Sequence, residues 1–306
     1  MLRLLLYRVL GLAVILVLVS VISFSITYVV PGDVALVIAG PGASQASIEK
    51  IRSDLLLDEP FLVRYGTWLG SVMRGDLGAS AITRQPVAEI VGFRLVNTMK
   101  LALAGIVLAI VLGIALGLVA ALYRNSLVDY GAMLVSVLGI SAPVFWVGLM
   151  LIYVFSVRLR WLPITDQGGV AHLILPAITI GMYSVAVIAR VTRFNLLEVL
   201  GRDYIRTAKA KGASTARMSL KHALKNALIP VVTVIGLQFG YLMGGAVLTE
   251  TVFAYPGIGR LFADVVFTRD FPVMQILMLL LAAIFAVTNF LVDISYALLD
   301  PRIRHA

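Results

Sequence analysis

Long apolar runs alternate with polar segments along this 306-residue chain, and the runs predict six membrane-spanning helices. Each run exceeds the ~20 residues that an α-helix needs to cross the hydrocarbon core of a bilayer. Charged residues flank the runs and do not occur inside them, so each predicted span lies in the uncharged stretch between two charged residues. The predicted spans are 9–30, 101–122, 130–157, the segment between Asp166 and Arg190, 226–249 and 271–292.

The first apolar run is expected to remain in the membrane as a helix. It follows Arg3 and Arg8 and holds 22 uncharged residues before Pro31-Gly32-Asp33. A secretory signal peptide has a shorter apolar core with a small-residue cleavage site close behind it. We therefore expect an uncleaved first transmembrane helix.

The polar segment 31–100 carries seven basic and seven acidic residues, a balance that suits the outer face of a membrane. Its length predicts a small folded cap, broken into short pieces by proline and glycine. Within it, residues 74–80 (RGDLGAS) predict a tight turn held by the Asp76 side chain. The predicted breaks are Pro41-Gly42, Gly66, Gly70 and Gly75.

A second polar segment, Gly201–Ile229, is strongly basic and lies between two spans. It predicts a short helix over 202–211, with Asp203 near the positive end of the helix dipole. Gly212 is the left-handed residue at which such a helix would stop, and a hydroxyl residue shortly after it can cap a second helix. The pattern predicts a bent helix–glycine–helix element. The alternative is a solvated loop that only carries positive charge.

Composition and charge indicate an integral membrane protein and its orientation. Hydrophobic residues make up 60% of the chain and charged residues only 13%, too few to cover a soluble protein of this size. The stretch from Arg190 to Lys225 holds nine basic residues against Glu198 and Asp203. The positive-inside rule places it in the cytoplasm, and six spans place both termini there as well. The net charge of +9 therefore reports orientation, and no nucleic-acid partner is expected.

The basic segment also carries a family resemblance. It reads YIRTAKAKG over 204–212 and HALKNALIP over 222–230, which resembles the cytoplasmic loop of ABC-importer permeases of the peptide/nickel subgroup. The general family signature, with Glu-Ala-Ala and Ile-x-Leu-Pro, agrees only at Ala208, Gly212 and Leu224. Where the chain departs from the general signature, it matches the version of that signature found in the peptide/nickel subgroup. Further stretches that resemble the subgroup are 31–33, 74–80, 250–261 and 293–304.

The resemblance implies an all-α integral membrane protein with the type I ABC importer permease fold. It also implies a second homologous permease as partner in a heterodimer, two ATP-binding subunits that hold ATP and magnesium (Mg), and an extracytoplasmic substrate-binding protein. The setting would be a bacterial inner membrane, with lipid around the spans. The residues that would insert into the ATPase are Asp203, Tyr204, Arg206, Thr207, Ala208, Lys209, Ala210, Lys211 and Gly212.

On this basis the chain is divided into three parts. Residues 1–95 would form the first helix and the cap, 96–298 the permease core with its coupling loop 190–228, and 299–306 a cytoplasmic tail. The implied substrates are short peptides, including glutathione-like ones. Nickel or a metal chelate is the alternative within the same subgroup.

Small residues and a proline in two spans leave two interpretations open. Gly236, Gly240 and Gly244 share one helical face, which allows close helix–helix approach. This face packs inside the bundle, or it meets the partner permease and helps to line the path. Ser141 and Pro143 mark a proline kink in the third span that is open to the same two interpretations.

The chain lacks the motifs of several other classes. No glycine is followed by lysine, so there is no phosphate-binding loop of the Walker type, and the three histidines are too scattered to suggest a metal site. We expect no catalytic residue, metal or cofactor in this chain. The apolar spans lack the midplane ionisable residues that ion-coupled carriers use, which disfavours the alternative of a secondary carrier that acts alone.

Overall fold

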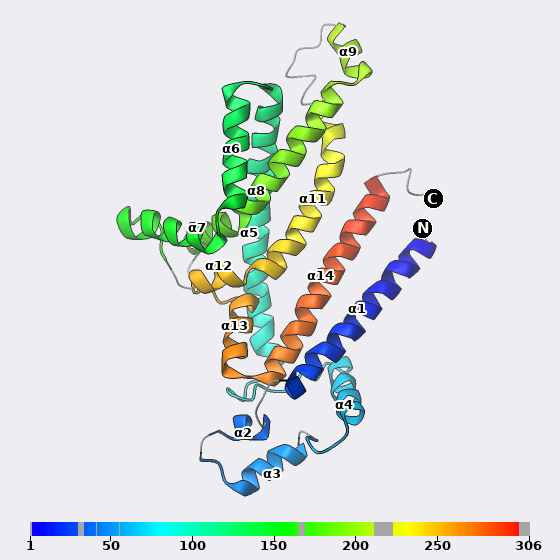
Figure 1. The fold of residues 1–306 in the computed structure, drawn as a ribbon, viewed down its shortest axis with the longest axis vertical. Helices are drawn as coiled ribbons and strands as arrows, with labels where there is room; N and C mark the ends of the chain where they lie inside the picture. Colours follow the sequence, from blue (N-terminus) through cyan, green and yellow to red (C-terminus); the bar gives the residue numbers. More distant parts are fainter. Residues whose placement is uncertain are drawn as a thin grey trace. The chain divides into compact units, whose positions relative to one another are not determined.

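The structure is a computed structural model, and it describes residues 2–29, 34–40, 42–54, 56–164, 169–210 and 223–299. Within these residues the regular elements are helices, and one isolated antiparallel bridge joins Ala79 to Pro86. The helices (Figure 1) are α1 Leu2–Val29, α2 Val34–Ala39, α3 Gln45–Asp54, α4 Phe61–Met73, α5 Val87–Leu122, α6 Leu127–Ser141, α7 Val144–Leu151, the π-helix η1 Ile152–Arg158, α8 Ala171–Leu200, α9 Asp203–Ala210, α11 Leu224–Gly245, α12 Val247–Val252, α13 Ile258–Thr268 and α14 Phe271–Leu299.

The predicted all-helical membrane fold is confirmed. In the described part of the chain, five helices are long and apolar enough to cross a bilayer, and a sixth span results if one bent pair is counted as one. The first of them, α1, leaves large apolar side chains such as Val14 and Leu18 more than half exposed. A helix that faces lipid requires no other cover for such side chains.

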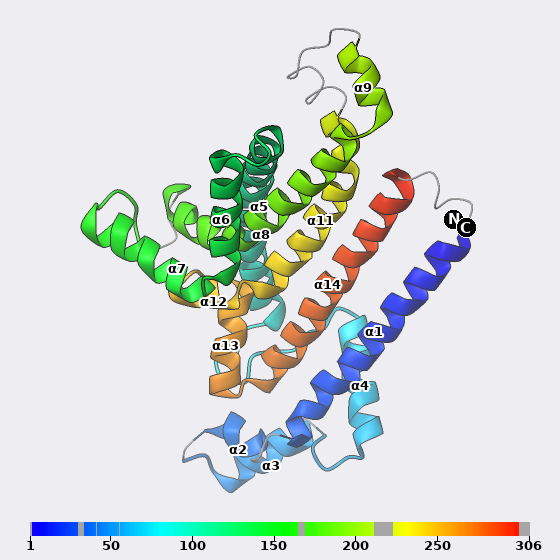
Figure 2. The same cartoon turned by 45° about the horizontal axis from the view of Figure 1, so that its top comes forward.

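The third predicted span is not the single, kinked helix that its apolar pattern suggested. α6 and the α7–η1 helix are bent by 106° across a break at Ala142 and Pro143. Proline has no N–H for the helix ladder and forces the residue before it out of the α-region, and Ala142 is indeed extended, with φ −76° and ψ 131°. Figures 1 and 2 both show α7 projecting sideways from the end of α6.

The cap also differs from expectation in two respects. Gly66 and Gly70 do not break it, because both lie inside α4, whereas Gly42 and Gly75 do adopt positive φ outside helices. α5 begins at Val87, fourteen residues before the predicted start of the second span at residue 101, because residues 87–100 continue the same helix.

The chain divides into two compact units. Unit 1 comprises 1–97 and 256–286, and unit 2 comprises 98–255 and 287–306, so that α5 and α14 each contribute to both. In unit 1 a buried apolar cluster joins the start of α5, α13 and the start of α14, with Val87, Ile258 and Leu277 fully buried. This division attaches 256–286 to the N-terminal part, which a division by sequence order could not do.

Unit 2 is built around α8, which packs against α6, α7, α11 and α12. The glycines of α5 allow a close approach to the same helix. A Cβ added at Gly117 would lie 2.5 Å from the carbonyl oxygen of Ala189, and one added at Gly105 would lie 2.8 Å from Ile180. These glycines are therefore packing residues, because nothing larger than hydrogen fits between the two backbones.

Candidate functional site

The short helix predicted over 202–211 is present as α9, Asp203–Ala210, which continues from α8 after a turn at Gly201. Asp203 lies in its first turn, as expected from the helix dipole. Both cartoon views place α9 at the end of unit 2 away from α12 (Figures 1 and 2). The rest of the predicted element, including Lys211 and Gly212, lies outside the described residues, and so do the side chains of Arg206, Ala208 and Lys209.

One residue of α9 anchors the helix, and others face solvent. Ile205 is 3% exposed and packs in a cluster with α8, the end of α5 and the start of α11, including Leu196 and Ala227. Asp203, Tyr204, Thr207 and Ala210 are exposed. The Tyr204 hydroxyl accepts a hydrogen bond of 2.9 Å from Asn226 at the start of α11. α9 therefore presents exposed, mostly polar residues and is anchored to its neighbouring helices by the buried Ile205.

An ion pair crosses the turn between α8 and α9. Arg202 donates to Glu198 one helical turn earlier, at 2.8 Å, and this hydrogen bond raises the pKa of the Arg202 guanidinium. Both side chains are more than half exposed. Solvent screens such a pair strongly, so it contributes little to stability.

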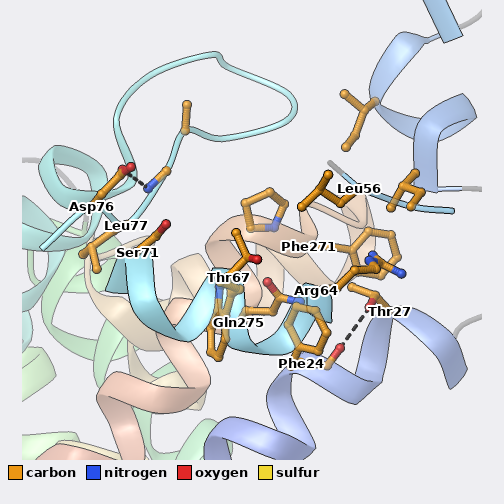
Figure 3. Close-up of a pocket in the computed structure, with 16 residues that line it drawn as sticks. Phe24, Thr27, Leu56, Arg64, Thr67, Ser71, Asp76, Leu77, Phe271 and Gln275 are labelled. Carbon is orange, nitrogen blue, oxygen red and sulfur yellow. Dashed lines mark hydrogen bonds between the residues drawn. The ribbon is translucent and has the colours of Figure 1, made fainter. Parts of the chain in front are cut away.

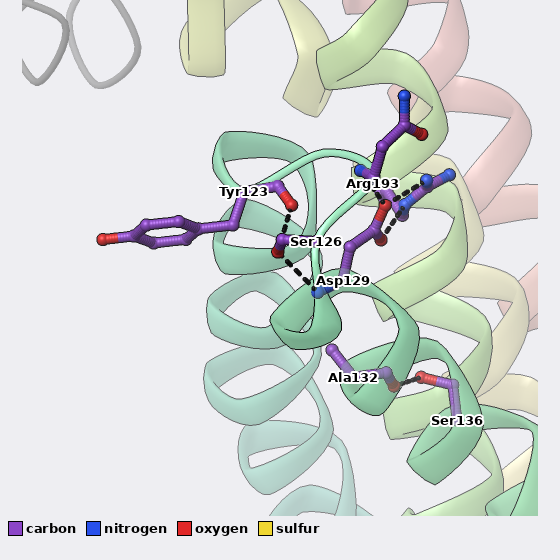
Figure 4. Close-up of polar contacts among 7 residues, drawn as sticks. Tyr123, Ser126, Asp129, Ala132, Ser136 and Arg193 are labelled. Atoms are coloured by element: carbon purple, nitrogen blue, oxygen red, sulfur yellow. Dashed lines mark hydrogen bonds and ion pairs between the residues drawn. The ribbon is translucent and has the colours of Figure 1, made fainter.

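A partly buried ion pair joins α8 to α6 (Figure 4). Arg193 donates from Nε and Nη2 to the two carboxylate oxygens of Asp129 at 2.6 and 2.7 Å. Asp129 is at the N-terminus of α6 and is only 2% exposed at its side chain. It also accepts the backbone N–H of Asn125, and its own N–H is capped by Ser126. This Asp129–Arg193 ion pair, the clamp, fixes α6 to α8 ten residues before α9 begins at Asp203.

The glycine stripe of α11 is explained largely by packing within the chain. A Cβ at Gly236 would overlap Val292 of α14, and one at Gly240 would lie 3.1 Å from Thr288. Gly244 has nothing within 4 Å. The intramolecular alternative therefore accounts for two of the three glycines, and Gly244 alone remains as a candidate for contact with a partner permease.

Ser141 and Pro143 lie at the 106° bend between α6 and α7, and both are exposed in this chain. The structure brings neither of them to α9 or to the glycine stripe. The role of these residues in the path stays a prediction. The bend of 106° is sharper than the proline kink that the sequence predicted.

Two buried carboxylates were used in the sequence only to mark the ends of spans. Glu250 is fully buried in unit 2 and accepts a 2.6 Å hydrogen bond from Thr98. Asp270 in unit 1 accepts from the Ser80 hydroxyl at 2.5 Å and from the Ala81 N–H at 3.0 Å. Each lies directly next to a predicted apolar span, 226–249 or 271–292, which is a signal that could have identified them. Burial, and then the nearby Glu250, raise the pKa of Tyr255.

The cap turn is confirmed as predicted. The Asp76 carboxylate accepts the N–H of Gly78 at 3.0 Å, and Gly75 and Gly78 have φ of 85° and 75°. Among the described residues, no group of three or more His, Cys, Asp or Glu side chains could hold a metal ion.

These features define a class of protein: a helical, multi-span membrane component in which a short polar helix, α9, follows one of the long apolar helices. Two family models match the chain. One, "Binding-protein-dependent transport system inner membrane component", covers residues 113–305, and the corresponding N-terminal model covers residues 1–102. The chain belongs to this family of inner-membrane permease components of ABC importers, and the ATPase is a separate component.

Curated relatives match over the whole chain. The glutathione transport system permease protein GsiC of Escherichia coli (strain K12) is 44% identical over 305 residues, covering 100% of both chains. The probable peptide ABC transporter permease protein y4tP of Sinorhizobium fredii is 43% identical and covers 97% of this chain and 98% of its own. A crystal structure of an amino acid ABC transporter with histidines has a TM-score of 0.52 at 16% identity, covering 69% of this chain and 94% of that one. It supports the fold alone.

Proposed function

We propose that this permease forms, with a homologous permease, the membrane path of an importer for short peptides, including glutathione-like ones. The names of the relatives that match over the full length motivate the substrate class. Residues 31–100 would face the exterior and receive a binding protein, and the basic segment and both termini would be cytoplasmic. The nine basic residues between Arg190 and Lys225 support this orientation.

The observation that carries the mechanism is the construction of α9. Its exposed residues Asp203, Tyr204, Thr207 and Ala210 form a surface for an ATP-binding subunit. Its buried Ile205 transmits the movement of that surface to α8 and α11. The Asp129–Arg193 clamp passes the movement on to α6. ATP binding and hydrolysis in the partner would thereby bias the two permeases between inward-facing and outward-facing arrangements.

Site-directed crosslinking tests the contact. Thr207→Cys in the complete transporter should crosslink to the ATP-binding subunit, with a yield that changes when nucleotide binds. A Thr207→Cys variant that reacts only with reagents added outside the cell would overturn the orientation.

A substitution at the expected corner tests the coupling. Gly212→Val should leave assembly intact and uncouple ATP hydrolysis from peptide uptake. Normal uptake by the Gly212→Val variant would show that the corner is unnecessary.

A further inference from the structure

Unit 1 contains a cavity of about 430 Å³ that follows one face of α4 (Figure 3). From α4 the lining residues are Arg64, Thr67, Trp68 and Ser71, which are spaced as i, i+3, i+4 and i+7 and therefore form one stripe of the helix. The opposite walls come from the last turns of α1, the loop after α3 and the start of α14. The volume is within the range of small-ligand sites.

The cavity has one positive and one negative end. Arg64 lies in the first turn of α4, and Asp76 follows its last turn. Figure 3 shows the two side chains on opposite sides of the cavity, with Gln275 between them. α4 continues from Arg64 to its helical C-cap Arg74, and the Asp76 N–H then donates to the carbonyl of Ser71 at 3.0 Å, so the two charged residues are separated by about three turns of helix, roughly 15 Å at 1.5 Å per residue.

Neither charge is neutralised by an ion pair in the described part of the chain. Arg64 donates from Nη1 to the Tyr28 hydroxyl at 2.5 Å, and its guanidinium lies 4.8 and 5.7 Å from the ring centroids of Tyr28 and Phe24. Within the part of the chain that the structure describes, the Arg64 Nε is buried without a hydrogen-bond partner, and the Asp76 carboxylate accepts only the Gly78 N–H that shapes the turn. A cation held by aromatic faces and a carboxylate with spare lone pairs both favour ligand charges of opposite sign.

A polar group lies between the two charges. Gln275 of α14 is only 6% exposed and lines the cavity. A Gln amide offers both donors and an acceptor, which is the complement of a peptide group.

We propose that this cavity binds a short, zwitterionic peptide of about three residues in an extended conformation. Arg64 would receive the C-terminal carboxylate, Gln275 a peptide group and Asp76 the N-terminal ammonium. Three extended residues span roughly 10 Å, and a charge-assisted hydrogen bond of about 2.8 Å at each end brings the total to roughly 15 Å, which matches the separation of the two charged residues. The inference rests on the proposed function, and it adds a peptide site on the permease itself. A phosphatidylethanolamine headgroup has the same two charges, but only two carbons separate its ammonium from its phosphate oxygen, too few to reach both ends.

Calorimetric titration of the full chain in phosphatidylglycerol nanodiscs tests the site. The ligands are trialanine, N-acetyl-trialanine and trialanine amide, and identical discs with phosphatidylethanolamine form the lipid arm. Trialanine should bind, and blocking either end should weaken binding by about tenfold or more, because each block removes a charge-assisted hydrogen bond. Arg64→Gln should abolish the penalty of amidation, and Asp76→Asn the penalty of acetylation. Arg52→Gln, which removes an exposed cation of α3, is the matched control and should change neither penalty.

Several results would overturn the proposal. Equal affinity for all three peptides would show that the charged ends are not read, and absence of trialanine binding at millimolar concentration would remove the site. If trialanine does not bind in the phosphatidylethanolamine discs and the wild-type chain retains that lipid, the cavity is a lipid site. The peptide comparison requires no variant, so it stands even where a substitution impairs folding. Peptide uptake by the complete transporter is measured separately: uptake without binding to this cavity refutes the site alone, and absence of uptake refutes the proposed function.

Discussion

Single residues show how this chain keeps charge inside an apolar bundle. Asp129 and Arg193 are 64 positions apart, and each satisfies the other through two hydrogen bonds. In the sequence Asp129 bounded a predicted span and Arg193 was one of the nine basic residues between Arg190 and Lys225, and nothing in the local pattern indicated that they would pair. Pairing is favoured because an unpaired charge at either position would lose its hydration without compensation.

Arg193→Gln should therefore destabilise the protein by about 3 kcal/mol, because it leaves the Asp129 carboxylate buried and unpaired. Thermal unfolding of the purified chain in detergent measures the loss. Arg202→Gln, which breaks the exposed pair with Glu198, is the matched control and should leave the midpoint unchanged. Equal midpoints for the two variants would contradict the assignment of the clamp.

At the scale of elements, small residues decide how closely helices approach. The sequence analysis identified the glycines of α11, and the structure shows that Gly113 and Gly117 of α5 are also closely packed. Gly113 and Gly117 of α5 lie against Ile188, Ala189 and Thr192 of α8. Their spacing of four was visible in the sequence, but the identity of the facing helix was not, because it depends on the tertiary arrangement.

Gly117→Ala should destabilise unit 2 by about 1–3 kcal/mol, since the new methyl group would lie 2.5 Å from a backbone carbonyl that cannot move alone. Gly244→Ala adds the same methyl group where nothing lies within 4 Å and should be neutral in the isolated chain. Unfolding midpoints of the two variants, compared in one detergent, measure the difference. A neutral Gly117 variant would mean that α5 and α8 are farther apart than described.

α9 provides a second prediction at this scale. Ile205→Ala should remove about 2–4 kcal/mol of packing under the helix, and Ile205→Val, which loses one methylene, should cost about 0.5–1.5 kcal/mol. In the reconstituted transporter, peptide uptake per ATP hydrolysed should fall in the same order, because a loosened helix transmits less movement. An unchanged ratio in the alanine variant would show that Ile205 does not transmit movement from the ATPase.

At the scale of the whole molecule, the proposed mechanism has the chain change between its inward-facing and outward-facing arrangements in response to ATP binding and hydrolysis in a separate ATPase. Purified chain in liposomes should not move radiolabelled trialanine down a gradient, and the complete transporter with its binding protein should import it only with ATP. Excess nickel should not compete with the peptide. Gradient-driven flux through the chain alone would support a secondary carrier, and competition by nickel would favour the metal alternative.

The sequence by itself determined the membrane class, the approximate spans, the helix at 203–210 and the cap turn at Asp76. Such features depend on local pattern, because the bilayer sets the length of an apolar helix and a side chain two residues away can close a turn. The tertiary structure alone decided the 106° bend, the closeness of α5 to α8, the burial of Asp129, Glu250 and Asp270, and the cavity along α4. These depend on contacts between distant segments, such as Ser80 with Asp270 across 190 positions. Hydrophobic periodicity shows that a face is buried but contains no information about which segment covers it.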